Sequence, residues 1–137
     1  MGVHPWDAAA AVDWEEVEFF LCDRRVVAVG ECGIDRLRGP ELPVQEAVFR
    51  RQVGLSERYG KPLILHAVRS MEDVLRVRRE MCAGQLWIWH GYRGGAEQAR
   101  QLVRAGIAVS VGAGYDGRLS DAVPPEMLFM ESDNGVR

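Results

Sequence analysis

The feature of the sequence that most limits its fold is a set of five short apolar runs separated by longer stretches with helical spacing. Each run is bounded by turn-forming or polar residues. Continuous apolar runs of this length are typical of strands buried on both faces, as in parallel sheets. The sequence therefore predicts five parallel strands, at residues 26–30, 62–66, 86–90, 107–112 and 127–131.

The stretches between the runs predict helices. Asp13 and Glu16 form a capping-box pattern that opens a helix through about residue 21. Gly106 follows the last helical stretch, where a helix C-terminus favours a residue with positive φ. Three further helices are predicted from apolar stripes, formed by Val44, Val48, Leu55 and Tyr59, by Met71, Val74, Leu75 and Cys82, and by Ala96, Ala99, Leu102 and Val103.

Alternation of strands and helices predicts an α/β fold built from βαβ units. A complete (β/α)₈ barrel takes about 250 residues. This chain has 137 residues and five clear strands, or six if the stub at residues 3–4 is counted. We therefore expect a single domain over residues 1–137 that forms a partial TIM barrel with parallel strands and outer helices.

Charge and composition narrow the class of protein further. Seventeen basic residues against 20 acidic ones give a net charge of −3, so any contact with nucleic acid is expected to be local. No apolar stretch approaches the roughly 20 residues that span a bilayer, and the first residues lack the layout of a secretory signal. We expect a cytoplasmic protein with no membrane contact. Cys22, Cys32 and Cys82 are widely spaced and odd in number, which predicts free, mostly buried thiols.

Side chains that can bind metal follow four of the predicted strands. Glu31, His66 and His90 each come directly at the end of an apolar run, and Glu131 and Asp133 follow the last one. The carboxyl ends of parallel strands face one side of a sheet or barrel, and that side carries the active site. Imidazoles combined with carboxylates suit zinc, manganese or magnesium, and a bound ion activates water for hydrolysis.

Each of these residues also has a structural interpretation. A single histidine at a strand end is more often structural than a ligand, although four such strand ends together favour the metal site. Asp35 could serve only as a cap for the following segment. Trp87 and Trp89 flank an apolar run, so we expect them to pack in the core, and a ring near the pocket mouth could also stack on a base.

Residues 112–117 match the G-x-G-x-x-G pattern of dinucleotide-binding proteins. That site requires a long crossover helix starting within the glycines. Pro124 and Pro125 leave room for less than two helical turns, so a glycine-rich turn is the favoured interpretation.

At these residues the sequence resembles the TatD family of metal-dependent hydrolases, which have a TIM-barrel fold and are usually described as deoxyribonucleases. Residues 45–52 also resemble the family's Q-x-x-x-F-x-x-Q helix. Segments that resemble the family's motifs follow one another in order: residues 2–5 resemble G-x-H-P, 30–35 G-E-x-G-L-D, 61–66 K-P-x-x-x-H, 90–94 H-x-F-x-G and 131–133 E-T-D. Tyr92 and Arg93 stand where the family more usually has Phe and a small hydroxyl residue.

The resemblance implies a metal centre with one or two divalent ions per chain. In that centre Glu31 bridges, His66 and His90 hold one ion, and Asp133 serves the other. Glu31 and Asp133 are then the catalytic carboxylates. Substrate phosphate is expected to contact His4, Arg69 and Arg93.

The chain also departs from the family's pattern. Family members begin with a strand carrying H-x-H, whose histidines complete the second ion's shell, and this sequence contains no such motif. The first residues align near the family's second strand and the last ones just after the E-T-D strand. We therefore expect a barrel without its two ends.

Two hypotheses about function follow, one for an active enzyme and one for a protein with impaired catalysis. The first is a metal-dependent phosphoesterase of the deoxyribonuclease type, acting on DNA ends or small phosphodiesters. The second is a catalytically impaired, truncated protein whose exposed strand edges pair with another copy. A metal-dependent amide hydrolase stays open as a further alternative, because the same ligands polarise carbonyl groups.

Overall fold

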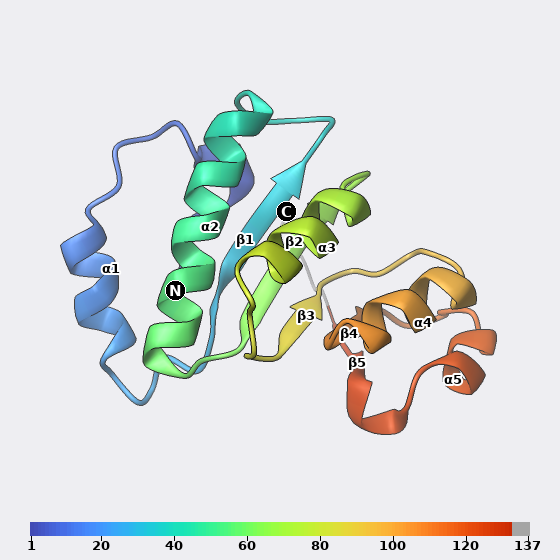
Figure 1. Ribbon diagram of the computed structural model, residues 1–137. Coiled ribbons are helices and arrows are strands. Elements are labelled where there is room, and N and C mark those ends of the chain that lie inside the picture. Colours follow the sequence, from blue (N-terminus) through green and yellow to red (C-terminus); the bar gives the residue numbers. More distant parts are fainter. Residues whose placement is uncertain (133–137) are drawn as a thin grey trace.

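The computed structural model describes residues 1–132, whose strands form one parallel sheet in sequential order (Figure 1). Every neighbouring pair of strands is parallel. The sheet is not closed, which confirms the predicted α/β fold with a partial barrel. The strands are β1 (Val29–Asp35), β2 (Leu63–Val68), β3 (Trp87–Trp89), β4 (Ile107–Val111) and β5 (Leu128–Met130).

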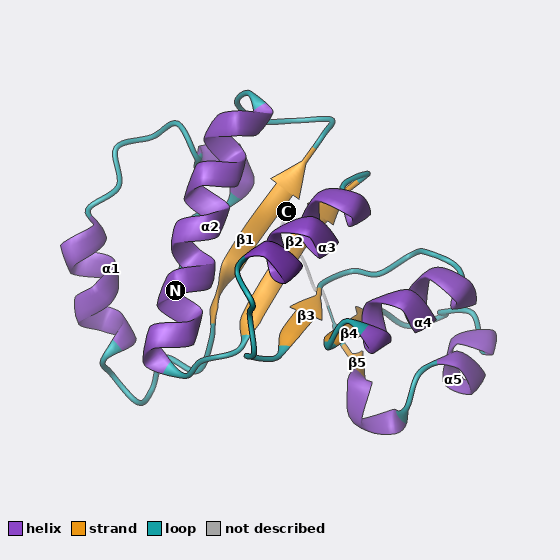
Figure 2. Ribbon diagram, viewed as in Figure 1, coloured by secondary structure: helices purple, strands orange, loops and turns teal. Residues whose placement is uncertain are grey.

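Helices connect the strands and cover the sheet (Figure 2). Helix α2 packs on β1, α3 lies over β1 and β2, and α4 packs on β4 together with α5. The helical elements are η1 (Pro5–Asp7), α1 (Trp14–Leu21), α2 (Leu42–Tyr59), α3 (Met71–Glu80), α4 (Ala96–Arg104), α5 (Arg118–Ala122) and η2 (Pro125–Met127). In the described part of the chain, no helix is both long and apolar enough to cross a bilayer.

Local signals explain several helix boundaries. Asp13 accepts the backbone N–H of Glu16 at 3.1 Å, so Asp13 caps the start of α1 as predicted. Gly106 has φ of 78° directly after α4, as predicted. Helix α5 has only five residues, which is too short for the crossover helix of a dinucleotide site and confirms the glycine-rich turn before it.

Strand β1 differs from its predicted position at residues 26–30. Val27 is 76% exposed, and the strand begins at Val29 and continues through Asp35. The ladder to β2 shifts register between Val29 and Cys32, a bulge-like feature that re-aims the intervening side chains. Glu31 therefore lies within the strand, and Asp35 ends it.

Helix α2 confirms only part of its predicted apolar stripe, since Leu55 is buried and Tyr59 packs against the same cluster. Val44 is exposed, whereas Phe49 and Val53 are fully buried in the core. Gln45 and Gln52 are buried beside them and hydrogen-bond to backbone groups of neighbouring segments. The inward face of α2 thus includes two polar residues whose hydrogen bonds are satisfied.

Gln52 attaches the N-terminal segment to helix α2. Its side-chain oxygen accepts the Val3 N–H at 2.7 Å, and its amide nitrogen donates to the Val3 carbonyl at 3.0 Å. Met1 attaches the same segment to β1, because its carbonyl accepts the N–H of Gly30 at 3.0 Å. Residues 1–3 therefore lie beside the start of β1 and lead into η1.

The main core lies between the sheet and helices α2, α3 and α4. Trp87 is fully buried and Trp89 is 9% exposed, so both tryptophans pack in the core as predicted. Cys32 is buried, but Cys22 and Cys82 are exposed, so the prediction of mostly buried thiols was wrong. Cys82 comes after the end of α3 with φ of 50°, in a turn that carries it off the apolar stripe.

Candidate metal centre

Three neighbouring strands bring Glu31, His66 and His90 together. Glu31 lies within β1 and His66 within β2, not at the strand ends as predicted, whereas His90 directly follows β3. Glu31 Oε2 lies 3.8 Å from His66 Nδ1, and Glu31 Oε1 lies 3.9 Å from His90 Nε2. Each carboxylate oxygen of Glu31 thus faces one imidazole nitrogen. Both separations are too long for a hydrogen bond.

The second nitrogen of His66 is held by Asp35. His66 Nε2 lies 3.0 Å from Asp35 Oδ2, and the Asp35 side chain is only 4% exposed. Burial works to raise the pKa of Asp35, but hydrogen bonds donated by Trp6, His66 and Leu37 outweigh it and leave the pKa below its usual value. An ionised carboxylate only accepts, so His66 carries its proton on Nε2 and leaves the Nδ1 lone pair facing Glu31.

Glu131, which directly follows β5, holds the second nitrogen of His90 in the way that Asp35 holds that of His66. Its Oε2 lies 2.8 Å from His90 Nδ1 and also accepts the Gly91 N–H and the Ser110 hydroxyl. Burial works to raise the pKa of Glu131, but these donors together keep it below its usual value. His90 is therefore protonated on Nδ1, and its Nε2 lone pair faces Glu31.

Glu31 offers a divalent ion one imidazole beside each of its oxygens, and in the described part of the chain the ligand atoms that all lie within 4.8 Å of one another belong to His4, Glu31 and His66. Ligand bonds of about 2.0–2.2 Å place the ligand atoms of one ion roughly 3–4 Å apart. Metal-binding histidines usually donate their other N–H to a carboxylate, which fixes the ring and its tautomer. Both His66 and His90 have such a carboxylate, so the donor set matches the chemistry of a zinc, manganese or related site.

His4 lies beside these groups at the start of η1. The closest ligand-type atoms of His4, Glu31 and His66 all lie within 4.8 Å of one another. His4 Nδ1 accepts the backbone N–H of Trp6 at 3.2 Å, so the neutral ring carries its proton on Nε2. Burial, and then the proximity of His66, lower the pKa of His4, which favours this neutral form. His4 is thereby arranged as a hydrogen-bond donor.

A cavity of about 1310 Å³ opens beside Glu31 and the histidines. Arg69, on the loop after β2, and Arg93, on the loop after β3, both line it and are exposed. Arg69 has φ of 51°, a conformation that is uncommon for a residue other than glycine, and Ser70 anchors this turn by donating to the Ile34 carbonyl at 2.7 Å. The predicted substrate-binding residues thus share one cavity.

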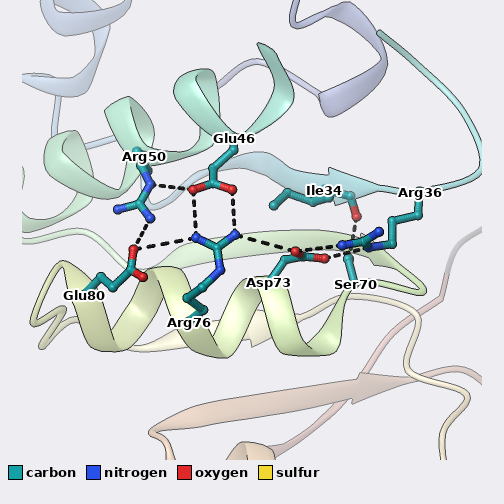
Figure 3. A network of polar contacts seen from close by, with 8 residues as sticks. All are labelled: Ile34, Arg36, Glu46, Arg50, Ser70, Asp73, Arg76 and Glu80. Atoms are coloured by element: carbon teal, nitrogen blue, oxygen red, sulfur yellow. Dashed lines mark hydrogen bonds and ion pairs between the residues drawn. The ribbon is translucent and has the colours of Figure 1, made fainter. Parts of the chain in front are cut away.

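A chain of ion pairs fixes the wall of this cavity formed by α3 (Figure 3). The Arg36 guanidinium donates two hydrogen bonds to the Asp73 carboxylate, at 2.8 and 2.9 Å, and both residues line the cavity. Arg76 lies 3.6 Å from Asp73 and binds Glu46 of α2 at 2.6 and 3.0 Å. The first turn of α3 is therefore joined both to the end of β1 and to α2.

The structure brings together Glu31, His66, His90 and His4, whereas Asp133 lies outside the described residues. Sequence reasoning missed the part played by Asp35. Its Oδ1 does accept backbone N–H groups, from Leu37 and Arg38, but its Oδ2 holds His66. The sequence does contain a signal for this role. Asp35 lies four residues after Glu31, and residues i and i+4 of a strand face the same side.

Fold and site together define an α/β protein of the barrel type with a candidate metal centre formed on and next to strands β1 to β3. The chain belongs to the TatD family: the family model described as TatD related DNase matches residues 1–134.

The relatives support this assignment. The chain is 37% identical to an uncharacterized metal-dependent hydrolase TatD of Mycobacterium tuberculosis, over 97% of this chain and 56% of that protein. It is 30% identical to a protein of Edwardsiella piscicida named 3'-5' ssDNA/RNA exonuclease TatD, over 96% of this chain and 55% of that protein. The crystal structure of the TatD homologue YJJV from Escherichia coli matches 97% of this chain and 56% of its own, with a TM-score of 0.80 and 26% identity. The chain spans about half the length of these relatives.

Proposed function

We propose that this chain is a metal-dependent hydrolase of phosphodiester bonds, acting on the ends of DNA or on small phosphodiesters. The observation that carries the proposal is the position of Glu31, with one oxygen facing His66 Nδ1 at 3.8 Å and the other facing His90 Nε2 at 3.9 Å. A carboxylate lies behind each imidazole, Asp35 at His66 Nε2 and Glu131 at His90 Nδ1, as is usual for metal-binding histidines.

Glu31, His66 and His90 would hold one divalent ion. When bound, that ion supplies Lewis-acid activation of water and of a phosphoryl oxygen, so no side-chain nucleophile is required. Asp133, as ligand of a second ion and as catalytic carboxylate, remains a prediction from the family resemblance. Zinc, manganese and magnesium are the candidate metals.

The chain's own cations and donors suit a phosphodiester substrate. Arg69 and Arg93 extend from two adjacent loops into the cavity, and neither is engaged by another described residue. Guanidinium groups bind phosphate oxygens with two parallel hydrogen bonds. His4 adds an N–H donor beside Glu31. In the proposed reaction a water oxygen bonds to phosphorus, the ester bond to the leaving oxygen breaks, and that oxygen gains a proton.

Metal stoichiometry and turnover on one sample test this proposal. Protein purified without chelator is assayed for bound metal and for hydrolysis of bis(p-nitrophenyl) phosphate and of single-stranded DNA. We expect about one or two ions per chain, with turnover of both substrates. Glu31→Gln should lose metal and turnover, whereas Glu15→Gln, an exposed change on α1, should retain both.

The other outcomes are equally informative. A chain that binds no metal and turns over neither substrate contradicts the proposal and favours the non-catalytic alternative. Hydrolysis of a p-nitroanilide with no hydrolysis of phosphodiesters would contradict the proposed phosphodiesterase and favour an amide hydrolase.

A further inference from the structure

Trp6 makes a directed polar contact inside the metal centre. Its indole Nε1 donates to Asp35 Oδ2 at 2.7 Å, and the same oxygen lies 3.0 Å from His66 Nε2. An indole N–H can only donate, so the direction of this bond is fixed. The ring is 39% exposed, so simple burial of apolar surface does not account for its position.

The Asp35 carboxylate is held from both of its oxygens. Oδ1 accepts the backbone N–H groups of Leu37 at 2.8 Å and of Arg38 at 3.1 Å. Oδ2 accepts from Trp6 and from His66. Trp6 is the one side chain other than His66 that donates to Asp35 in the described part of the chain, so it restricts the rotation of the carboxylate on the side of the metal centre.

The surroundings of Trp6 keep the indole in place despite its exposure. The Arg38 guanidinium lies 3.8 Å from the centre of its ring, within cation–π distance. The Trp6 ring also makes edge-on contacts with the rings of His4 and His66, at centroid separations of 4.6 and 5.4 Å. Trp6 is thus packed on His4 and His66, both of which lie near Glu31.

We propose that Trp6 is a positioning residue of the metal centre, whose indole N–H fixes Asp35 so that His66 keeps Nδ1 available for a metal ion. The proposal rests on the metal centre proposed above, and it adds a contact from η1 that the family's G-x-H-P motif does not include. Trp6 touches neither the ion nor the substrate in this role; it acts through Asp35 and His66.

Trp6→Phe removes the N–H and keeps an aromatic ring. Trp14→Phe is the matched control, because Trp14 lies on α1 and packs against Arg51. Nitrogen NMR of the imidazoles in the metal-free chain at pH 8 reports which His66 nitrogen carries the proton. Zinc affinity is measured separately by competition with a chelator.

We expect the wild-type chain and Trp14→Phe to show His66 protonated on Nε2, and Trp6→Phe to show a mixture of tautomers. Replacing a residue behind a metal ligand typically weakens metal binding 10- to 100-fold. Trp6 is one contact further away, so we expect zinc affinity to fall about 3- to 10-fold in Trp6→Phe only. A variant with the wild-type tautomer and wild-type affinity would overturn the proposal.

A measurement on the wild-type chain decides the question if Trp6→Phe does not fold. The indole N–H resonance of Trp6 should exchange slowly with solvent and should shift when zinc is added. An indole proton that exchanges freely and ignores zinc contradicts the proposal. If the wild-type chain binds no zinc, the proposed function fails, and the His66 tautomer in the metal-free variants still decides whether Trp6 positions Asp35.

Discussion

Gly33 lies where β1 passes closest to β2, between Glu31 and Asp35. It has φ of 145°, and a Cβ atom at this position would lie 2.2 Å from the carbonyl oxygen of His66. Both strands carry residues of the metal centre, so neither can move away without displacing His66. A glycine is therefore required at this point of the site.

Replacing Gly33 with Ala should destabilise the protein by about 2–4 kcal/mol, because the strands must separate or strain. Gly54→Ala is the control: nothing lies within 4 Å of the added methyl group, and the position is in helix α2. That change should stabilise the protein by about 0.5–1 kcal/mol. Urea unfolding midpoints measure both, and an unchanged midpoint for Gly33→Ala would contradict this account of the strand contact.

The residues that escaped sequence prediction are the polar residues that face inward. Gln45 lies on the buried face of α2 because its side chain bonds to backbone atoms of Asp35, Arg38 and Pro40. A hydrophobic stripe cannot reveal such a residue, since burial of a polar group is favourable only when its distant partners are known. The apolar stripe instead predicts that Val44 is buried, and the structure shows that Val44 is exposed.

At the scale of elements, ion pairs hold α3 against α2 (Figure 3). Glu46 binds Arg76, and Arg50 of the same helix pairs with both Glu46 and Glu80. Hydrogen bonding by Arg76 lowers the pKa of Glu46 most; burial opposes it, Arg50 adds to it, and the pKa falls to about 2. The carboxylate therefore stabilises the folded state wherever it is ionised.

Glu46→Gln tests this network through its pH dependence. Glu46 has a folded pKa of about 2, below its ordinary value of 4.5, so its contribution is complete above pH 4.5 and is lost as the pH falls toward 2. Because the groups are partly exposed, we expect the variant to be less stable by only about 1–2 kcal/mol at pH 7. The difference in urea midpoints between wild type and variant should shrink between pH 4.5 and 2. A difference that stays constant over that range would exclude the ionic contribution.

Strand positions were predictable where strands are apolar and not where one faces the metal centre. The runs that became β2 to β5 were found because they are apolar throughout; β4 is buried on both faces, whereas Phe129 and Met130 of β5 are exposed. In β1, Cys32 and Ile34 pack in the core while Glu31 and Asp35 face the site. That alternation ends the apolar run at Gly30, although the strand continues for five more residues.

For the whole molecule, the proposed metal joins separate segments. Glu31 lies on β1, His66 on β2 and His90 after β3, so an ion held by all three stabilises the folded chain but not the unfolded one. At a free metal concentration about 100 times the dissociation constant, this linkage contributes about 2.7 kcal/mol. For a chain of this size we expect chelation to lower the melting temperature by about 10 °C.

Thermal unfolding with and without chelator measures this effect. The Glu31→Gln variant should show no chelator-dependent shift, because its site is already lost. Identical melting temperatures for the wild-type chain in the two conditions would argue against a resident ion.

The edge of the sheet at β5 leads to a prediction about assembly. In the described part of the chain β5 pairs only with β4, and Met130 and Phe129 on it are 63% and 38% exposed. Exposed apolar edges favour pairing with another chain, so we expect the apparent mass to rise with concentration. Met130→Lys should reduce that rise in sedimentation velocity experiments. A monomer at every concentration would contradict self-association.

The two hydrogen bonds between Gln52 and Val3 have a consequence for the order of folding. His4 and Trp6 lie one and three residues after Val3, and the side chain that joins Val3 to α2 lies 49 residues away from Val3 in the sequence. Contacts over such a span form only after the intervening chain has collapsed. We therefore expect the candidate metal centre to form late in folding, after α2 has docked, so that binding of an ion would report that the fold is complete.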